Sequence, residues 1–100
     1  MLRCDKVKKT KESNMPEISR FYGIIIRMFY GDHSPPHFHA QSGEYKATFS
    51  IETGQMIQGE MPPNKACLIT AWATIHKEEI MNNWDSLYEG CAAKKINPLQ

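Results

Sequence analysis

Apolar and polar residues alternate along residues 37–51, and the short apolar run at residues 24–30 is rich in β-branched and aromatic residues; both patterns predict β-strands. Turns rich in glycine and proline bound the strand-like stretches of residues 17–59. We expect strands at residues 18–22, 24–30, 37–41, 44–51 and 55–58. Because short connections join consecutive strands, the pattern predicts a mainly antiparallel meander sheet.

The clearest hairpin lies between residues 37 and 51, where Ser42 and Gly43 supply a two-residue turn. This turn places His39 opposite Lys46 and divides the hairpin into two faces. The polar face carries His37, His39, Lys46 and Thr48. The apolar face carries Phe38, Ala40, Tyr45, Ala47, Phe49 and Ile51. The polar residues of both strands fall on the same face, so this face is expected to be exposed to solvent and the apolar face to contact the core.

A helical pattern begins at Asn64, directly after the Pro62-Pro63 pair. Its apolar positions recur every four residues, and that step would drift around a straight helix by roughly 160° over the run. We therefore expect a bend, or two helices, meeting near His76. The residues predicted to face the sheet are Leu68, Trp72 and Ile75, followed by Ile80, Trp84 and Leu87. Gly90 is the predicted stop, and residues 91–100 read as a loose tail.

Together these elements predict an α+β fold, in which a mainly antiparallel meander sheet is followed by a bent helix or two helices packed on one face. We expect residues 1–14 to form a disordered, lysine-rich tail and residues 15–100 to form a single α+β domain. Met15 is an alternative to Met1 as the natural start. The chain has no apolar run near the roughly 20 residues of a membrane helix and no secretory leader, so a cytoplasmic location without membrane contact is expected.

The formal net charge is +1, so any surface that attracts nucleic acid has to be local. Three histidines crowd the segment GDHSPPHFH and form the candidate site. A His-x-His pair on a strand places the imidazoles of His37 and His39 on one face, roughly 6 to 7 Å apart. His33 lies on a loop stiffened by prolines that can return to the same place. Three histidines are a common ligand set for a divalent transition metal such as zinc, and Asp32 could complete it.

Lys46 favours a different ligand, because a cation beside the histidines repels a metal ion and attracts a phosphate or an RNA backbone. In this interpretation Arg27 and His33 help to bind the anion. His37 and His39 can also transfer protons, so together with Lys46 they form the candidate catalytic set of a metal-free, ribonuclease-type activity. In a third interpretation the histidines are structural, or lie in an interface with a partner protein.

Several segments, in order, resemble a bacterial family, the domain of unknown function family 4160, and GDHSPPHFH is the most specific of them. The resembling segments are MPEISRFYGI at 15–24, GDHSPPHFHA at 31–40, GEYKATFSIETG at 43–54, HKEEIMNNW at 76–84 and KKINPL at 94–99. The resemblance implies a short, standalone protein whose gene lies beside another short gene. It therefore implies a toxin–antitoxin-like component with a small partner protein encoded nearby. The chain departs from the family at Pro63-Asn64, where members often carry basic residues.

The leading hypothesis is a toxin–antitoxin-like component that binds a partner protein, and RNA as well, through a histidine-bearing sheet face. The first alternative is a metal-binding protein that uses the His-x3-His-x-His cluster of His33, His37 and His39. The second alternative is an interaction module without catalytic activity.

Overall fold

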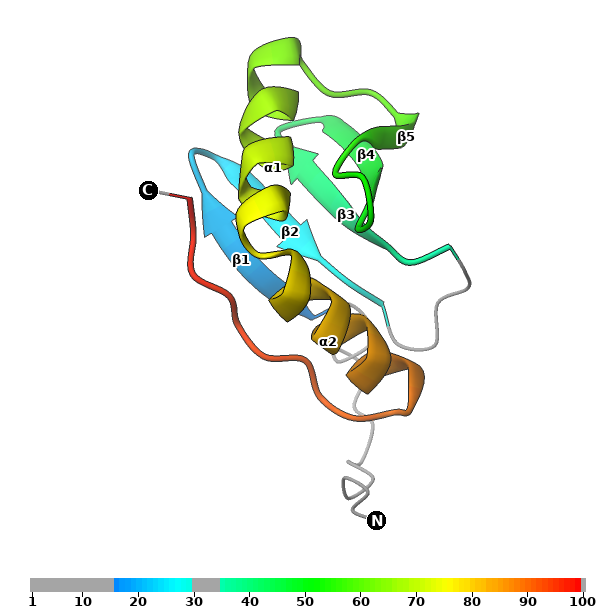
Figure 1. Ribbon diagram of the computed structural model, residues 1–100. Coiled ribbons are helices and arrows are strands. Elements are labelled where there is room, and N and C mark those ends of the chain that lie inside the picture. The colour runs from blue at the N-terminus through cyan, green and yellow to red at the C-terminus, as the bar shows by residue number, and fades with distance from the viewer. Residues whose placement is uncertain (1–15, 30–34, 100) are drawn as a thin grey trace.

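The structure is a computed structural model that describes residues 16–29 and 35–99. In this part of the chain, a five-stranded antiparallel sheet with strand order β1-β2-β3-β4-β5 is followed by two helices (Figure 1). The strands are β1 (Glu17–Phe21), β2 (Ile24–Arg27), β3 (His37–Ser42), β4 (Tyr45–Ser50) and β5 (Met56–Gly59). The helices are α1 (Pro63–Ile75) and α2 (Lys77–Tyr88). The predicted α+β meander is confirmed.

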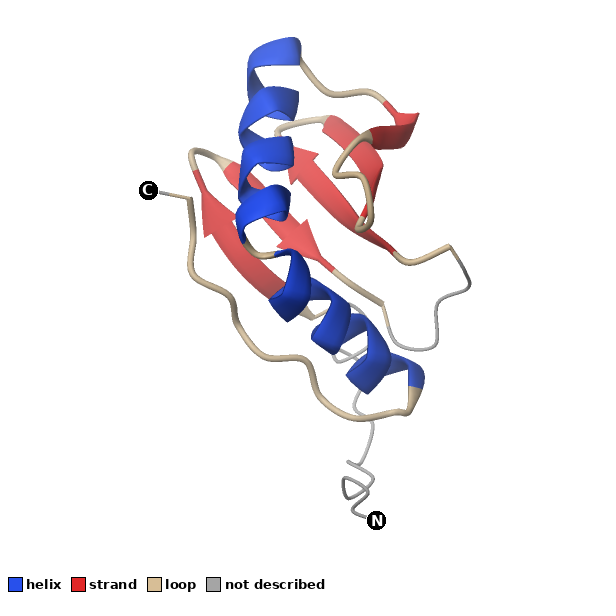
Figure 2. Cartoon of the chain, viewed as in Figure 1, coloured by secondary structure: helices blue, strands red, loops and turns tan. Residues whose placement is uncertain are grey.

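Both helices lie on the same face of the sheet, and the core fills the space between the two layers (Figure 2). At its centre the ring of Phe38 stacks on that of Phe49, with centroids 5.7 Å apart, and meets the indole of Trp72 edge-on. Trp72 is fully buried and Trp84 nearly so, which confirms that the tryptophans are core residues. Neither described helix is long and apolar enough to span a bilayer.

The helical run breaks at His76, as predicted, because α1 ends at Ile75 and α2 begins at Lys77. One predicted core position is wrong: Ile75 is 66% exposed. On the 3.6-residue period the buried stripe of α1 follows Ile69, Trp72 and Ala73, and residue 75 lies roughly 110° around the helix from the centre of that stripe. All three predicted core positions of α2 are buried.

The segment after α2 is not a loose tail, which corrects the prediction for residues 91–100. Residues 91–99 run back along the outer edge of β1 (Figure 1). The backbone N–H of Ile96 donates to the carbonyl of Ile18 at 2.8 Å, and the Ile96 side chain is buried. The indole N–H of Trp72 also donates to the carbonyl of Asn97 at 2.8 Å. This edge of the sheet is therefore covered by the chain itself.

The β3–β4 hairpin turns one residue later than predicted. Gly43 and Glu44 form its turn, and Gly43 has a φ of 62°. A glycine at the first central position is typical of a type II′ turn, which explains the difference. The predicted pairing of His39 with Lys46 is consequently wrong, since Thr48 lies opposite His39. Each residue keeps its predicted face, because the pairing moves by two residues along β4.

Candidate anion-binding face of the sheet

The sheet face opposite the helices, called the outer face below, carries a hollow of about 430 Å³. Strand alternation turns every second side chain of the central strands towards this face. The polar side chains that line the hollow are Arg27, His39, Gln41, Lys46, Thr48 and Gln58, which come from β2, β3, β4 and β5. Its described lining contains two cations and no carboxylate.

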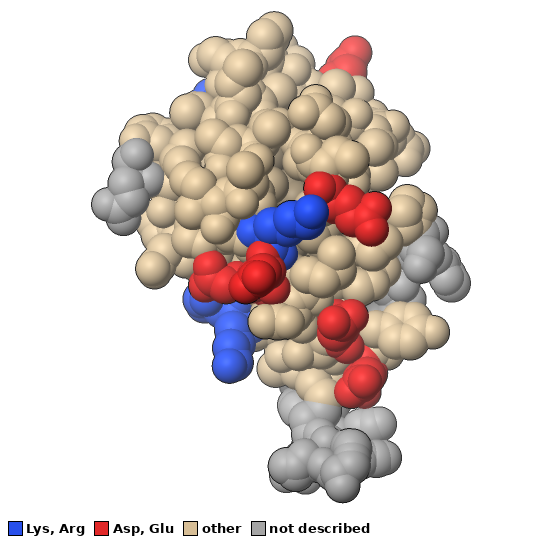
Figure 3. Space-filling view, in the orientation of Figure 1, with Lys and Arg blue, Asp and Glu red and all other residues tan. Residues whose placement is uncertain are grey.

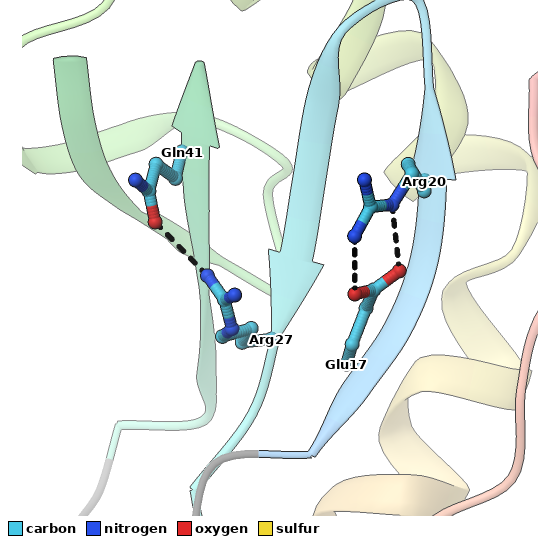
Figure 4. A network of polar contacts seen from close by, with 4 residues as sticks. All are labelled: Glu17, Arg20, Arg27 and Gln41. Carbon is cyan, nitrogen blue, oxygen red and sulfur yellow. Dashed lines mark hydrogen bonds and ion pairs between the residues drawn. The ribbon is translucent and has the colours of Figure 1, made fainter. Parts of the chain in front are cut away.

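A hydrogen bond across two strands positions Arg27 in this hollow. The Nη1 of Arg27 donates to the Oε1 of Gln41 at 2.9 Å (Figure 4). The amide of Gln41 is itself oriented by a longer bond, from its Nε2 to the carbonyl of Gly43 at 3.4 Å. A guanidinium has five N–H donors and this bond uses one of them, so Arg27 is held in place with donors to spare for an anion.

His39 lies opposite Arg27 in the β2–β3 ladder and opposite Thr48 in the β3–β4 ladder. Its Nδ1 is 3.4 Å from the hydroxyl oxygen of Thr48. The ring of Phe29 lies beside it, with centroids 4.3 Å apart and planes inclined by 30°. The imidazole therefore has a polar neighbour on β4 and an aromatic neighbour in the segment after β2, and all three residues line the hollow.

His37 occupies the beginning of β3, and its Nδ1 is 2.7 Å from the carbonyl oxygen of Pro35. A carbonyl only accepts, so Nδ1 carries a proton in this contact. The ring meets that of His39 nearly edge-on, with centroids 5.0 Å apart, and lies 5.2 Å from the indole of Trp84. His37 thus connects the outer face to α2.

The structure brings some of the predicted site residues together and separates others. The two imidazoles adjoin, as the His-x-His spacing predicted, and Arg27, His39 and Lys46 share the hollow. Lys46 pairs with Gln41, which lies four residues along β3 from His37. The backbones of Lys46 and His37 are therefore roughly 13 Å apart along the strands. The predicted catalytic set therefore spreads along the sheet. His33 and Asp32 lie outside the described residues.

A carboxylate beside Arg27 is bound by a different arginine. Glu17 lies opposite Arg27 in the β1–β2 ladder, but its carboxylate accepts two hydrogen bonds from Arg20, at 2.9 and 3.0 Å (Figure 4). These bonds from Arg20 lower the pKa of Glu17 below its ordinary value, against a smaller opposing effect of burial. On the helix-covered side, by contrast, Lys and Arg side chains lie among Asp and Glu (Figure 3). On the outer face, by comparison, the described lining of the hollow has two cations and no carboxylate.

The described residues contain no group of three His, Cys, Asp or Glu side chains that could hold a metal ion. The predicted metal set depends on His33, which the structure does not describe. Sequence reasoning missed Gln41, Gln58 and Phe29 as members of the outer face. The alternation that placed His39 there also applies to Gln41, two residues later, and would have identified it.

The fold and the outer face define a small α+β protein with an open, cationic sheet surface. The sequence model of the family described as "Domain of unknown function (DUF4160)" matches residues 23–85, more than half of the chain, and the protein belongs to this family. The matched span contains β2 to β5, α1 and most of α2, so it includes every strand that lines the hollow. The resemblance seen in the sequence is confirmed. Neither the curated proteins nor the solved structures gave a match.

Proposed function

We propose that this protein binds single-stranded RNA through the outer face of its sheet, as one component of a toxin–antitoxin-like pair. The observation that supports RNA binding is the joint position of Arg27 and Lys46. Both line one hollow whose described lining has no carboxylate. Cations positioned by neighbouring strands are the groups that bind a phosphate backbone.

The rest of the hollow suits a nucleotide better than an isolated phosphate. The apolar part of its lining includes Ile25 and Phe29, and the ring of Phe29 lies against His39. Aromatic side chains on a sheet surface stack the splayed bases of single-stranded RNA. Amide and hydroxyl groups, here of Gln58 and Thr48, can bond to base edges and to the 2′-hydroxyl.

The test is fluorescence anisotropy with a short, labelled, mixed-sequence RNA and the full chain. Replacing Arg27 and Lys46 together by Gln should weaken binding by at least about tenfold, because each charge-assisted contact contributes about 1.5–3 kcal/mol. Lys77→Gln removes the same kind of charge at the start of α2 and should leave binding unchanged. The proposal fails if the wild-type chain does not bind, or if the double variant binds as the control does.

A ribonuclease-type step is a second candidate, and one observation favours it: the imidazoles of His37 and His39 adjoin on the outer face. One histidine can take a proton from the attacking hydroxyl while the other gives one to the leaving oxygen. Cleavage by this route should persist in a chelator and disappear in His37→Ala. Cleavage abolished by the chelator would instead favour the metal-binding alternative, with His33 as the third ligand.

The toxin–antitoxin part of the proposal is supported by the family resemblance and concerns a small partner protein encoded nearby. It is tested by bacterial growth after induction of the full chain, compared with a His37→Ala, His39→Ala double variant that still folds. Arrest by the wild type alone, relieved by the neighbouring gene product in a 1:1 complex, is the expected result. Normal growth in both cultures would leave RNA binding standing and would remove the toxin role.

A further inference from the structure

The two edges of the sheet differ in how they are covered. The β1 edge is covered by the C-terminal segment, through the hydrogen bond from Ile96 to Ile18. The described part of the chain places nothing along the β5 edge, and all four β5 residues are exposed. Met56 and Ile57 remain 41% and 51% exposed, and β5 contains neither a charged residue nor a proline. An uncovered edge without these protective residues is a template for another strand.

We propose that β5 pairs antiparallel with β5 of a second copy of this chain, so that two sheets join across a two-fold axis. The backbone of β5 has groups directed towards this edge. Glu60 donates its N–H to the carbonyl of Lys46, so alternation turns the N–H and C=O of Gly59 away from β4. Ile57 is the extra residue of a bulge and has no partner in the β4 ladder, since Thr48 pairs with Gln58 and Phe49 with Met56.

These directions determine the register of the pairing. Gly59 of one copy would exchange hydrogen bonds with Ile57 of the other, which places the two Gln58 residues opposite each other on the axis. A two-fold axis brings identical side chains together, so a charge at position 58 would meet a like charge. Position 58 carries an amide, and one amide can donate to the other. Ile57 would cover Gly59 of the other copy, where no side chain competes for space.

The cations of the outer face do not oppose this pairing. Lys46 lies on β4, level with Glu60, so the two Lys46 backbones would be three strand spacings apart across the sheet and four residues apart along it, or roughly 19 Å. This separation exceeds the Debye length of about 8 Å at physiological ionic strength, and the repulsion is largely screened. Two strands of four residues bury less than the roughly 1,200 Å² of a stable interface, so we expect a dimer that dissociates on dilution.

Sedimentation velocity of the full chain over a range of concentrations tests the dimer. The wild-type mass should rise from 11.5 kDa towards twice that value as the concentration increases. Ile57→Lys should remain monomeric at every concentration. Ile75→Lys is the matched control, because Ile75 is a similarly exposed isoleucine at the end of α1, and this variant should dimerise as the wild type does. A wild type that stays monomeric, or two variants that behave alike, would overturn the proposal.

Disulfide crosslinking tests the register. In a Cys67→Ser background, Gln58→Cys should form a disulfide-linked dimer under mild oxidation, because residues opposite each other on the axis are close enough for a disulfide. Met56→Cys should not, since the two copies of residue 56 would be roughly 13 Å apart in this register. The Cys67→Ser protein without a further substitution still contains Cys4 and Cys91, and any crosslinked dimer that it forms is the background to subtract. Equal crosslinking of the two variants would overturn the register.

The dimer does not depend on the proposed function, and the two can fail separately. Ile57→Lys leaves Arg27, Lys46 and the hollow in place, so a monomeric variant should still bind a short RNA. Because the pairing places both outer faces on the same side of the joined sheet, the dimer should bind an RNA long enough to span both hollows more tightly than a monomer does.

Discussion

Asn83 of α2 binds the backbone of Lys94 in both directions: its Nδ2 donates to the carbonyl of Lys94 at 2.8 Å, and its Oδ1 accepts from the N–H of the same residue at 2.9 Å. Asn83 is only 3% exposed, although it is polar. The pair acts as a clamp that turns the chain after α2 back towards β1. The C-terminal segment is therefore part of the fold.

Asn83→Ala should lower the free energy of unfolding by about 2 kcal/mol, because two hydrogen bonds are lost and a partly buried peptide group loses its partner. Asn82→Ala is the control, since Asn82 is an exposed neighbour on the same helix, and its effect should stay within about 0.5 kcal/mol. Urea denaturation of the two variants measures both values. Equal stability would show that the C-terminal segment contributes nothing through this contact.

Gly59 and Gly43 both have positive φ angles, of 95° and 62°, but they differ in the space around them. A Cβ on Gly59 would overlap the carbonyl oxygen of Lys46 and lie 2.7 Å from the Cα of Ala47, whereas a Cβ on Gly43 would have no neighbour within 4 Å. Gly43→Ala should cost about 1 kcal/mol from backbone strain alone. Gly59→Ala should cost about 3 kcal/mol, because β4 and β5 must also separate. Thermal unfolding at low protein concentration compares them, and equal costs would contradict the close approach of the two strands.

The sequence predicted the elements well where a local pattern determines them. Alternation identified β3 and β4, β-branched and aromatic residues between two glycines identified β2, and drift of the apolar stripe identified the break at His76. The hairpin register depends on whether Ser42 or Glu44 joins Gly43 in the two-residue turn. The sequence is compatible with both turns, so the register could not be predicted. The sequence could not predict that the C-terminal segment packs against the domain, because its position depends on contacts with Asn83 and Trp72 that exist only in the folded chain.

The candidate site was predictable in part for the same reason. The spacing of His37 and His39 determines that they share a face, and Lys46 follows from the hairpin. The face of Arg27 could not be assigned from the sequence, because β2 is apolar on both sides of the arginine. The hydrogen bond from Arg27 to Gln41 joins residues 14 positions apart and required the β2–β3 register.

Arg20→Gln should raise the pKa of Glu17 towards its ordinary value, because the hydrogen bonds from Arg20 are the largest cause of its depression. A carboxyl whose pKa is lower in the folded state stabilises the protein above that pKa, and the contribution disappears as the pH falls through it. Wild type and Arg20→Gln should therefore differ in stability at neutral pH and converge in acid. The difference should be small, since the Arg20 side chain is 62% exposed.

An NMR titration of the Glu17 carboxyl carbon measures this pKa directly. Arg20→Lys keeps the charge but loses the two-pronged geometry, so it should give an intermediate value. A Glu17 pKa that is the same in all three proteins would contradict the assigned cause.

The salt dependence of RNA binding separates contacts with the phosphate backbone from contacts with bases. Each phosphate contact on a single strand contributes about −0.7 to the slope of log K against log salt concentration. Arg27→Gln and Lys46→Gln should each make the slope shallower by about 0.7, and their effects should add, because the two side chains come from different strands.

Phe29→Leu should weaken binding and leave the slope unchanged, since a stacked base releases no counterion. Lys77→Gln should change neither quantity. If the slope becomes shallower by the same amount in all the charge variants, including Lys77→Gln, the RNA responds to the net charge of the whole protein. If the slope is near zero in the wild type, the hollow binds an uncharged ligand.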